Sequence, residues 1–279
     1  MVPNFLVIGT AKSGTTTLAQ QLCRNPNVGF ASAAEPNFFA FDENYSRGMA
    51  YYESFFEHCT NKIMVGEKSW RYTVGALYPK ARDRIAAHLP NARLVYIVRH
   101  PLARTESLWM ECLSSGAEVV SKDFNEAIRE SVLFVDSSRY WTQLNRYRDY
   151  FSDDRILVLF YEDIASRQRN VLESLFSFIG VERALESGFE EARENVSAGK
   201  RGDKALLVAA RRMPGFAALR DAAPQIARGG LRRLLKRRLE RPTWDEDTRQ
   251  WFLGQVHEDC RRILSYAGKE ADYWRYDRL

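Results

Sequence analysis

A glycine-containing loop near the N-terminus has the composition of a phosphate-binding loop. The segment from Gly9 to Leu18 reads GTAKSGTTTL and follows the apolar run Phe5 to Ile8. The backbone N–H groups of such a loop, with the positive end of the helix dipole behind them, attract an anion. The alternative is a tight turn that binds nothing. The residues expected to contact a phosphate group are Lys12, Ser13, Gly14, Thr15 and Thr16.

This loop differs from the loop of ATP-hydrolysing proteins in the position of its lysine. Gly9 and Gly14 have the separation found in G-x-x-x-x-G-K-[ST], but Thr15 stands where that motif requires lysine. Lys12 lies inside the loop instead. The sequence therefore disfavours ATPase chemistry, and an ATP-dependent kinase of a nucleotide or small molecule is kept as an alternative.

A second segment also has residues suited to a phosphate group. Arg99 directly follows the apolar run Leu94 to Val98, and Ser107 comes two turns into the helix expected from Leu102 to Leu113. Ligands of open parallel sheets bind beyond the carboxyl ends of the strands, where Arg99 is expected. Arginine can hold a phosphate through two parallel hydrogen bonds, and a serine hydroxyl can donate to the same group. The alternative is an arginine that caps neighbouring backbone carbonyls.

Taken together, the two segments resemble the donor site of sulfotransferases that use 3′-phosphoadenosine 5′-phosphosulfate (PAPS). GTAKSGTTTL is similar to the loop that binds the 5′-phosphosulfate, and the segment from Arg99 to Ser107 is similar to the 3′-phosphate motif. The similarity runs from about residue 4 to 180, with a weaker match near the C-terminus. Three further segments resemble the heparan sulfate N- and 3-O-sulfotransferase branch: Glu35–Phe39, Asn44–Tyr52 and Gly66–Ser69.

The resemblance implies a catalytic role for three residues. In that branch the glutamate before the aromatic pair is the catalytic base, and this role falls on Glu35. Sulfuryl transfer needs a base for the proton of the acceptor and cations for the charge that grows on the leaving phosphate oxygen. Lys12 and Lys68 are expected to supply those cations. The expected product of the donor is adenosine 3′,5′-bisphosphate, and no motif indicates a metal.

The same residues have simpler interpretations without the resemblance. Glu35 precedes Pro36 and is then a loop carboxylate or a helix cap, and Lys68 is then a surface lysine. Lys68 nevertheless follows the apolar run Ile63 to Val65, which favours a position at the end of a strand. No histidine competes for the role of base, because three lie in expected helices or at their ends and the fourth is next to Arg99: His58, His88, His257 and His100.

The sequence departs from the heparan sulfate branch at several points. Asn37 stands where histidine is common, Trp70 stands where proline is common, and the C-terminal loop with a disulfide is absent. The family also has a late glycine-containing loop that closes over the nucleotide, for which Ser197 to Asp203 is the candidate. The residues expected to clamp the 3′-phosphate are Lys200, Arg201 and Gly202. These departures leave the acceptor open: a hydroxyl or an amine, on a carbohydrate or a small molecule.

The elements that must position these residues indicate an α/β protein. Strands are expected over Phe5 to Ile8, Arg93 to Val98 and Arg155 to Tyr161, each followed by a break or a helix. Such alternation predicts a central parallel sheet flanked by helices, in a single domain over residues 1–279. Besides the segments after Gly14 and His100, helices are expected near 77–88, 123–134, 138–151, 168–179 and 244–267.

The charge of the chain is concentrated in one segment. The net charge is +5, but residues 201–241 hold twelve Lys/Arg against three Asp/Glu, so the rest of the chain is negative. Leu231 to Arg241 has leucines at helical spacing among basic residues and predicts an amphipathic helix. Residues 195–242 are therefore expected to form a basic helical cap or a mobile insertion. The candidate roles of the helix are recruitment of an acidic acceptor, contact with an anionic membrane surface, nonspecific nucleic-acid binding, or a solvated face.

Several classes of protein are disfavoured by the remaining features. The longest apolar runs have four to six residues, no signal peptide is recognisable, and the four cysteines lack zinc or redox spacing. The chain is therefore expected to be cytoplasmic, without a transmembrane segment and with reduced thiols. No nucleic-acid-binding signature and no seam for an oligomer is found. A non-catalytic module that binds anions is the third candidate function.

Overall fold

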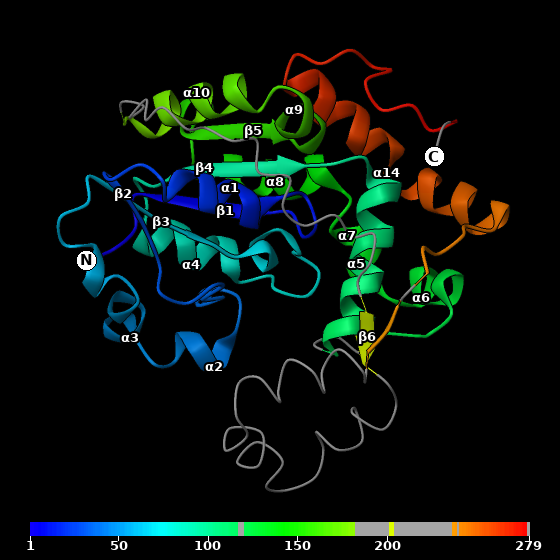
Figure 1. Ribbon diagram of the computed structural model, residues 1–279, viewed down its shortest axis with the longest axis horizontal. Coiled ribbons are helices and arrows are strands. Elements are labelled where there is room, and N and C mark those ends of the chain that lie inside the picture. Colours follow the sequence, from blue (N-terminus) through cyan, green and yellow to red (C-terminus); the bar gives the residue numbers. More distant parts are fainter. Residues whose placement is uncertain (117–119, 182–200, 204–235, 239, 278–279) are drawn as a thin grey trace, which may run out of the picture.

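A five-stranded parallel sheet forms the centre of the molecule in the computed structural model, which describes residues 1–116, 120–181, 201–203, 236–238 and 240–277. The strand order is β2-β3-β1-β4-β5, and all four neighbouring pairs are parallel. This confirms the predicted α/β class with a parallel sheet (Figure 1). The strands are β1 (Phe5–Gly9), β2 (Val28–Phe30), β3 (Met64–Lys68), β4 (Arg93–Val98) and β5 (Ile156–Phe160).

Helices cover both faces of the sheet because successive side chains of each strand point to opposite faces. Phe5 and Val7 of β1 belong to one hydrophobic cluster, which also includes residues of α1 (Thr15–Leu22), α9 (Tyr161–Ser166) and α10 (Gln168–Ile179). Leu6 and Ile8 belong to the cluster on the other face. The helices on that face are α4 (Ala81–His88), α5 (Pro101–Ser115), α6 (Phe124–Glu130), α7 (Val132–Asp136), α8 (Tyr140–Arg148) and α14 (Glu246–Tyr266).

Shorter elements complete the described part of the chain. Two short helices lie between β2 and β3, and single 3-10 turns precede β3, follow it, and precede β5. In Figure 1 the two helices lie to one side of the sheet, near the N-terminus. They are α2 (Asp42–Tyr45) and α3 (Met49–Ser54), and the turns are η1 (Glu57–Cys59), η2 (Trp70–Thr73) and η3 (Asp153–Arg155).

The predicted elements agree with the structure where the apolar pattern is long. The expected strands at 5–8, 93–98 and 155–161 match β1, β4 and β5 to within a residue at each end, and the expected helix at 168–179 is α10. The helix expected at 123–134 is instead two helices, α6 and α7, because Ser131 between them is extended. The strand β2 was not predicted, since its three residues, VGF, are too short to show alternation.

Part of the basic segment has a different secondary structure from the predicted one. Arg201–Asp203 (β6) and Lys236–Arg238 (β7) form an antiparallel pair, and β6 lies against α5 (Figure 1). The helix predicted from Leu231 to Arg241 is therefore wrong at 236–238, where the backbone pairs with β6 instead of with its own helical turn. Residues 204–235 lie outside the described residues, so a cap over 195–242 stays a prediction.

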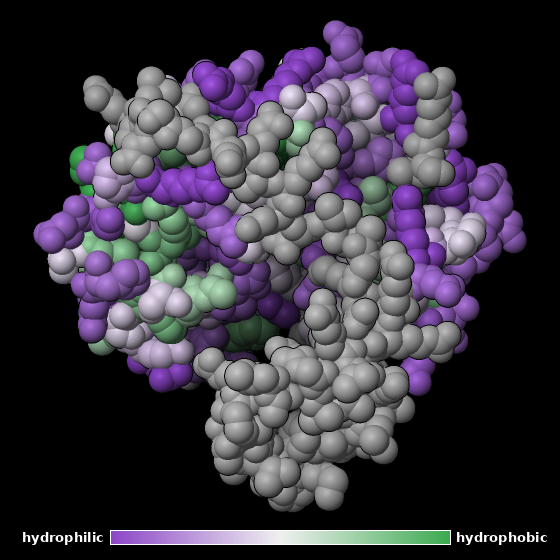
Figure 2. Space-filling view, viewed as in Figure 1, coloured by the Kyte–Doolittle hydropathy of each residue, from purple (hydrophilic) through white to green (hydrophobic). Residues whose placement is uncertain are grey.

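The described surface is mostly polar. Figure 2 shows hydrophilic residues over most of the visible described surface and a hydrophobic area near the β2–β3 side and the N-terminus. Ile63, just before β3, is 61% exposed, and Met1 and Val2 are also exposed. Among the described helices, none is long and apolar enough to cross a membrane. None of the four cysteines is in a disulfide.

The packing of Gly66 against Phe5 gives a test of the contact between β3 and β1. A Cβ atom at Gly66 would lie 2.3 Å from Cζ of Phe5, which is fully buried. We expect Gly66→Ala to lower the free energy of unfolding in urea by roughly 1–3 kcal/mol, because the ring must move within a packed core. The matched control is Gly254→Ala in α14, where a Cβ meets nothing within 4 Å, and this variant should be at least as stable as the parent. Equal stability of both variants would contradict the packing described here.

Candidate active site

The residues singled out by the sequence follow different strands of one parallel sheet. Glu35 comes after β2, Lys68 ends β3, Lys12 follows β1, and Arg99 follows β4. The carboxyl ends of parallel strands share one edge of the sheet, so the fold brings these four segments to the same edge. Tyr161, which directly follows β5, completes the set with a ring that lies under Arg99.

The connections after β1 and β4 run in opposite directions along the sheet. From β1 the chain moves past β3 to β2 at one edge, and from β4 it moves to β5 at the other edge. Adjacent strands with diverging connections leave a crevice at their carboxyl ends, which is where open α/β sheets bind ligands. The loop from Thr10 to Gly14 and Arg99 lie at this position, and Lys68 ends the strand on the other side of β1.

The loop after β1 has a backbone suited to an anion. Gly14 caps α1 with φ 86° and has no side chain to accept from the first N–H groups of that helix. A Cβ at Gly14 would lie 3.1 Å from the Tyr161 ring, so the close approach and the positive φ both favour glycine. Lys12 also has a positive φ, of 66°. The first turn of α1 therefore presents N–H groups without a side-chain cap.

The side chains of the loop have different exposures. The hydroxyl of Ser13 is buried, 3.0 Å from Oγ1 of Thr10, so it braces the loop from inside. Thr15 is buried and Thr16 is exposed. The ammonium of Lys12 is 3.1 Å from Oε2 of Glu111 in α5, and both side chains are partly exposed. Of the predicted loop residues, Lys12 and Thr16 thus have side chains that reach solvent.

Arg99 connects the two predicted phosphate segments. Its guanidinium NH1 donates to the backbone carbonyl of Lys12 at 3.0 Å and lies over the Tyr161 ring at 4.3 Å from the centroid. The carbonyl of Arg99 accepts from the hydroxyl of Tyr140 at 2.6 Å. The segment after β4 is therefore fixed against the loop after β1 by an arginine that caps a backbone carbonyl, the alternative role given above for Arg99, and its contact with a phosphate group stays a prediction.

Ser107 lies farther along α5 and is 2% exposed. Its neighbour Glu106 is also buried and accepts from Nε of Arg241 at 2.7 Å and from the indole N–H of Trp244 at 3.0 Å. These contacts anchor the end of the basic segment, and the residues directly after it, to the helix that carries Ser107. Sequence reasoning missed them because the partners are more than 130 residues apart.

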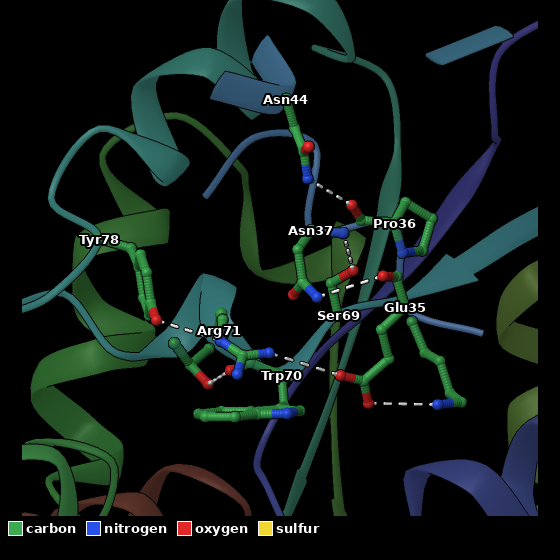
Figure 3. A network of polar contacts seen from close by, with 10 residues as sticks. Glu35, Pro36, Asn37, Asn44, Ser69, Trp70, Arg71 and Tyr78 are labelled. Carbon is green, nitrogen blue, oxygen red and sulfur yellow. Dashed lines mark hydrogen bonds and ion pairs between the residues drawn. The ribbon is translucent and has the colours of Figure 1, made fainter. Parts of the chain in front are cut away.

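Glu35 lies between two cations in the network shown in Figure 3. Its Oε1 is 3.3 Å from the ammonium of Lys68, and its Oε2 is 3.9 Å from NH1 of Arg71. The segment that carries it is held by hydrogen bonds from Asn37, whose N–H donates to Oγ of Ser69 at 3.0 Å and whose side-chain amide donates to the carbonyl of Glu35 at 3.2 Å. The structure thus brings Glu35 and Lys68 together, and adds Arg71, which the sequence did not indicate.

Glu67, next to Lys68, is a buried acid that sequence reasoning also missed. Its side chain is fully buried, and Oε1 accepts from the hydroxyl of Tyr72 at 2.7 Å. Burial raises the pKa of Glu67 to about 7, and the hydrogen bond from Tyr72 opposes this shift. The sequence did contain a signal for this buried carboxyl group, namely a glutamate that follows the apolar residues of a strand.

His100, beside the arginine, is not arranged as a base. Its backbone N–H donates to Oε1 of Glu162 at 2.8 Å, and its ring packs against Trp274 and Tyr276. Burial lowers the pKa of His100 to about 4, so the ring is neutral near pH 7. This supports the expectation that no histidine competes with Glu35.

Three further predicted residues belong to the late loop. Lys200 lies outside the described residues. Arg201 and Gly202 are in β6, whose backbone lies beside α5, the helix that carries Ser107. Their role as a clamp stays a prediction. Within the ranges that the structure describes, no group of three or more His, Cys, Asp or Glu has the arrangement of a metal site.

Comparison with known proteins gives consistent matches. The family model described as the sulfotransferase domain matches residues 3–200. The chain is 29% identical over 200 residues to the bifunctional heparan sulfate N-deacetylase/N-sulfotransferase 1 of Caenorhabditis briggsae, covering 64% of this chain and 22% of that protein. It is 29% identical over 191 residues to the human heparan sulfate glucosamine 3-O-sulfotransferase 6, covering 66% of this chain and 54% of that protein. The chain thus spans between about a fifth and about half of these relatives.

Two solved structures have a similar fold over almost the whole chain. A sulfotransferase from Alicyclobacillus acidocaldarius superimposes with a TM-score of 0.67 at 19% identity, covering 99% of both chains. The sulfotransferase domain of the curacin biosynthetic pathway has a TM-score of 0.53 at 16% identity, covering 96% of this chain and 99% of that one. At these identities the comparison supports the fold.

The buried carboxyl group of Glu67 gives a prediction about stability and pH. Between pH 4.5 and about 7 the folded chain keeps a proton that the unfolded chain has lost, so Glu67 makes the free energy of unfolding fall as the pH rises. In Glu67→Gln this contribution is absent. We expect the variant to gain stability relative to the parent from pH 5 to pH 8, by up to roughly 3 kcal/mol. Urea unfolding at a series of pH values measures this.

The control for this measurement is Glu130→Gln, an exposed carboxylate at the end of α6. Its difference from the parent should be constant over the same pH range. A difference between Glu67→Gln and the parent that does not change with pH would contradict the buried neutral acid.

Proposed function

The chain belongs to the sulfotransferase domain family, whose model matches residues 3–200, and we propose that it transfers a sulfuryl group from PAPS to a hydroxyl or amine of an acceptor. Membership in the family confirms the resemblance stated from the motifs. The observation that carries the proposal is the hydrogen bond from Arg99 to the Lys12 carbonyl. It joins the two phosphate segments at the sheet edge that also holds Glu35 and Lys68.

The residues of this edge fit the donor. The first turn of α1 lacks a side-chain cap, and Lys12 lies in the loop just before it. Free N–H groups beside an ammonium suit a 5′-phosphosulfate. Arg99, held by Tyr140 and Tyr161, suits a second phosphate group at a distance from the first. PAPS supplies a sulfuryl group bonded to a phosphate leaving group. Lys12, Arg99 and the loop bind and orient it, with Ser107, Lys200, Arg201 and Gly202 as further proposed contacts.

Glu35 and Lys68 have the chemistry for the transfer step. Glu35 takes the proton of the acceptor while the acceptor oxygen or nitrogen bonds to sulfur from the side opposite the phosphate. As the bond between sulfur and the phosphate oxygen breaks, Lys12 and Lys68 neutralise the charge left on that oxygen. The products are the sulfated acceptor and adenosine 3′,5′-bisphosphate, and no metal takes part in this proposal.

A carbohydrate is the favoured acceptor. The relatives named above are heparan sulfate N- and 3-O-sulfotransferases, so both an amine and a hydroxyl have a precedent among them. Two observations favour sulfuryl transfer over the kinase alternative. The family model matches the chain, and Thr15 replaces the lysine that a kinase of this type needs. A non-catalytic anion-binding module remains as an outcome of the tests below, and a cytoplasmic location stays a prediction.

Glu35→Gln tests the proposed base. We expect the variant to lose at least about 100-fold in kcat for sulfuryl transfer, because an amide cannot take the proton. Its affinity for adenosine 3′,5′-bisphosphate should remain within about threefold of the parent, since Glu35 is not a proposed donor contact. Transfer is measured with labelled PAPS and a panel of carbohydrate acceptors. The control is Glu53→Gln, a partly exposed carboxylate that pairs with the N-terminus. Parent-like transfer by Glu35→Gln would remove the base from the proposal.

Arg99→Ala tests the donor site without an acceptor. We expect its affinity for adenosine 3′,5′-bisphosphate to fall roughly 10- to 100-fold, the effect of losing a charge-assisted hydrogen bond. Titration calorimetry with the bisphosphate, ADP and Mg²⁺-ATP measures this. Arg262→Ala, on the exposed side of α14, should bind like the parent. A parent protein that prefers Mg²⁺-ATP would overturn the sulfotransferase donor in favour of a kinase, and binding without transfer to any acceptor would favour the anion-binding module.

A further inference from the structure

Arg71 and Lys68 divide the two oxygens of the Glu35 carboxylate between them. Lys68 lies 3.3 Å from Oε1, and NH1 of Arg71 lies 3.9 Å from Oε2 (Figure 3). Lys68 ends β3 and Arg71 belongs to the turn η2 that follows it, so only two residues, Ser69 and Trp70, separate the two cations along the chain. The carboxylate is therefore oriented by contacts on both sides.

The guanidinium of Arg71 is fixed independently of Glu35. Its Nε donates to the hydroxyl of Tyr78 at 3.1 Å. It also lies 4.3 Å from the centroid of the Trp70 ring and 5.3 Å from that of Phe41, and its side chain is only 12% exposed. A guanidinium held by a hydrogen bond and two ring faces loses little freedom when it also contacts a carboxylate.

Lys68 is held less completely. Within the described residues, its ammonium contacts the carboxylate of Glu35 and neither a ring nor a second acceptor. In the proposed reaction this ammonium neutralises the leaving phosphate oxygen. Moving toward that oxygen, it leaves Oε1 of Glu35 open to the acceptor, while Oε2 keeps its neighbour Arg71.

We propose that Arg71 is a positioning residue for Glu35: it holds Oε2 and fixes the orientation of the carboxylate, so that Oε1 takes the acceptor proton when Lys68 turns to the phosphate. The inference rests on the proposed function, because it assigns a task within that reaction. A base must be held within hydrogen-bond reach of the proton that it takes, and a contact on its second oxygen restricts the rotation of the carboxylate. Without Arg71, Glu35 has one cation, which the reaction itself draws away.

The charged and titratable groups near Glu35 come from two neighbouring elements. Lys68 and Glu67 come from β3, and Arg71, whose Nε donates to Tyr78, comes from η2. Glu67 interacts electrostatically with Glu35, and burial raises the pKa of Glu67 to about 7. Transfer by the Arg71 variants must therefore be measured in the Glu67→Gln background as well.

The test compares Arg71→Ala, Arg71→Lys and Arg71→Gln with the parent. In Arg71→Ala and Arg71→Gln we expect kcat for transfer to fall about 10-fold, with the KM for the acceptor within about threefold of the parent, because the base is present but no longer held in place. The same fall should appear in the Glu67→Gln background. Arg71→Lys keeps a cation beside Oε2, so it should recover most of the lost kcat. Affinity for adenosine 3′,5′-bisphosphate should be unchanged in all three.

The control variant is Arg47→Ala, another arginine over a ring, that of Tyr51, outside the Glu35 network. Its kcat and KM should match those of the parent. An unchanged kcat in both Arg71→Ala and Arg71→Gln overturns the inference, even if the KM for the acceptor rises, since that result makes Arg71 an acceptor contact. The proposed function fails separately, if Glu35→Gln transfers like the parent. Arg71→Gln keeps most of the volume of the side chain and replaces Arg71→Ala if that variant does not fold.

Discussion

The hydrogen bond from Arg99 to the carbonyl of Lys12 joins the loops that follow two adjacent strands. The strands themselves are paired in parallel from Phe5 with Arg93 onward, so the sheet brings the loops close but does not set their relative orientation. The guanidinium does so, because its planar donors meet a backbone carbonyl while the Tyr161 ring covers one face. Any ligand that contacts both loops therefore binds to loops whose relative orientation is already fixed. The other proposed contacts of the donor depend on this orientation.

The two lysines proposed for catalysis each lie near a carboxylate. Lys12 is near Glu111, and Lys68 is near Glu35. Both pairs are partly exposed, and pairs of this kind contribute only about 0–1 kcal/mol, so an entering anion can compete for the ammonium groups at small cost. The pairs also keep the lysine side chains at the edge of the sheet. Glu35 has a second cation beside it, Arg71, whose guanidinium also donates to Tyr78.

The sequence predicted the parts of the fold and site that depend on local patterns. The apolar run from Arg93 to Val98, the glycine loop and the helix at 168–179 each carry their signal within a few residues, and the structure has them where expected. The contacts of Arg71 and Glu106 could not be predicted in this way, because their partners come from distant segments. The helix predicted from Leu231 to Arg241 was wrong at 236–238, because pairing with the distant strand β6 overrides the local helical pattern.

The pairing register between β1 and β3 decides which side of the sheet each glutamate and lysine of β3 faces. Leu6 pairs with Glu67 and Val7 with Lys68, so Glu67 faces the same side as Leu6, toward Tyr72, and Lys68 faces the other. A slip of one residue would turn Glu67 away from Tyr72 and Lys68 toward it, because strand side chains alternate with a period of two. Gly66 protects this register, since its missing side chain leaves room for the Phe5 ring directly opposite. The position of Lys68, the lysine proposed for catalysis, is thus fixed by a glycine and a phenylalanine that take no part in the proposed chemistry.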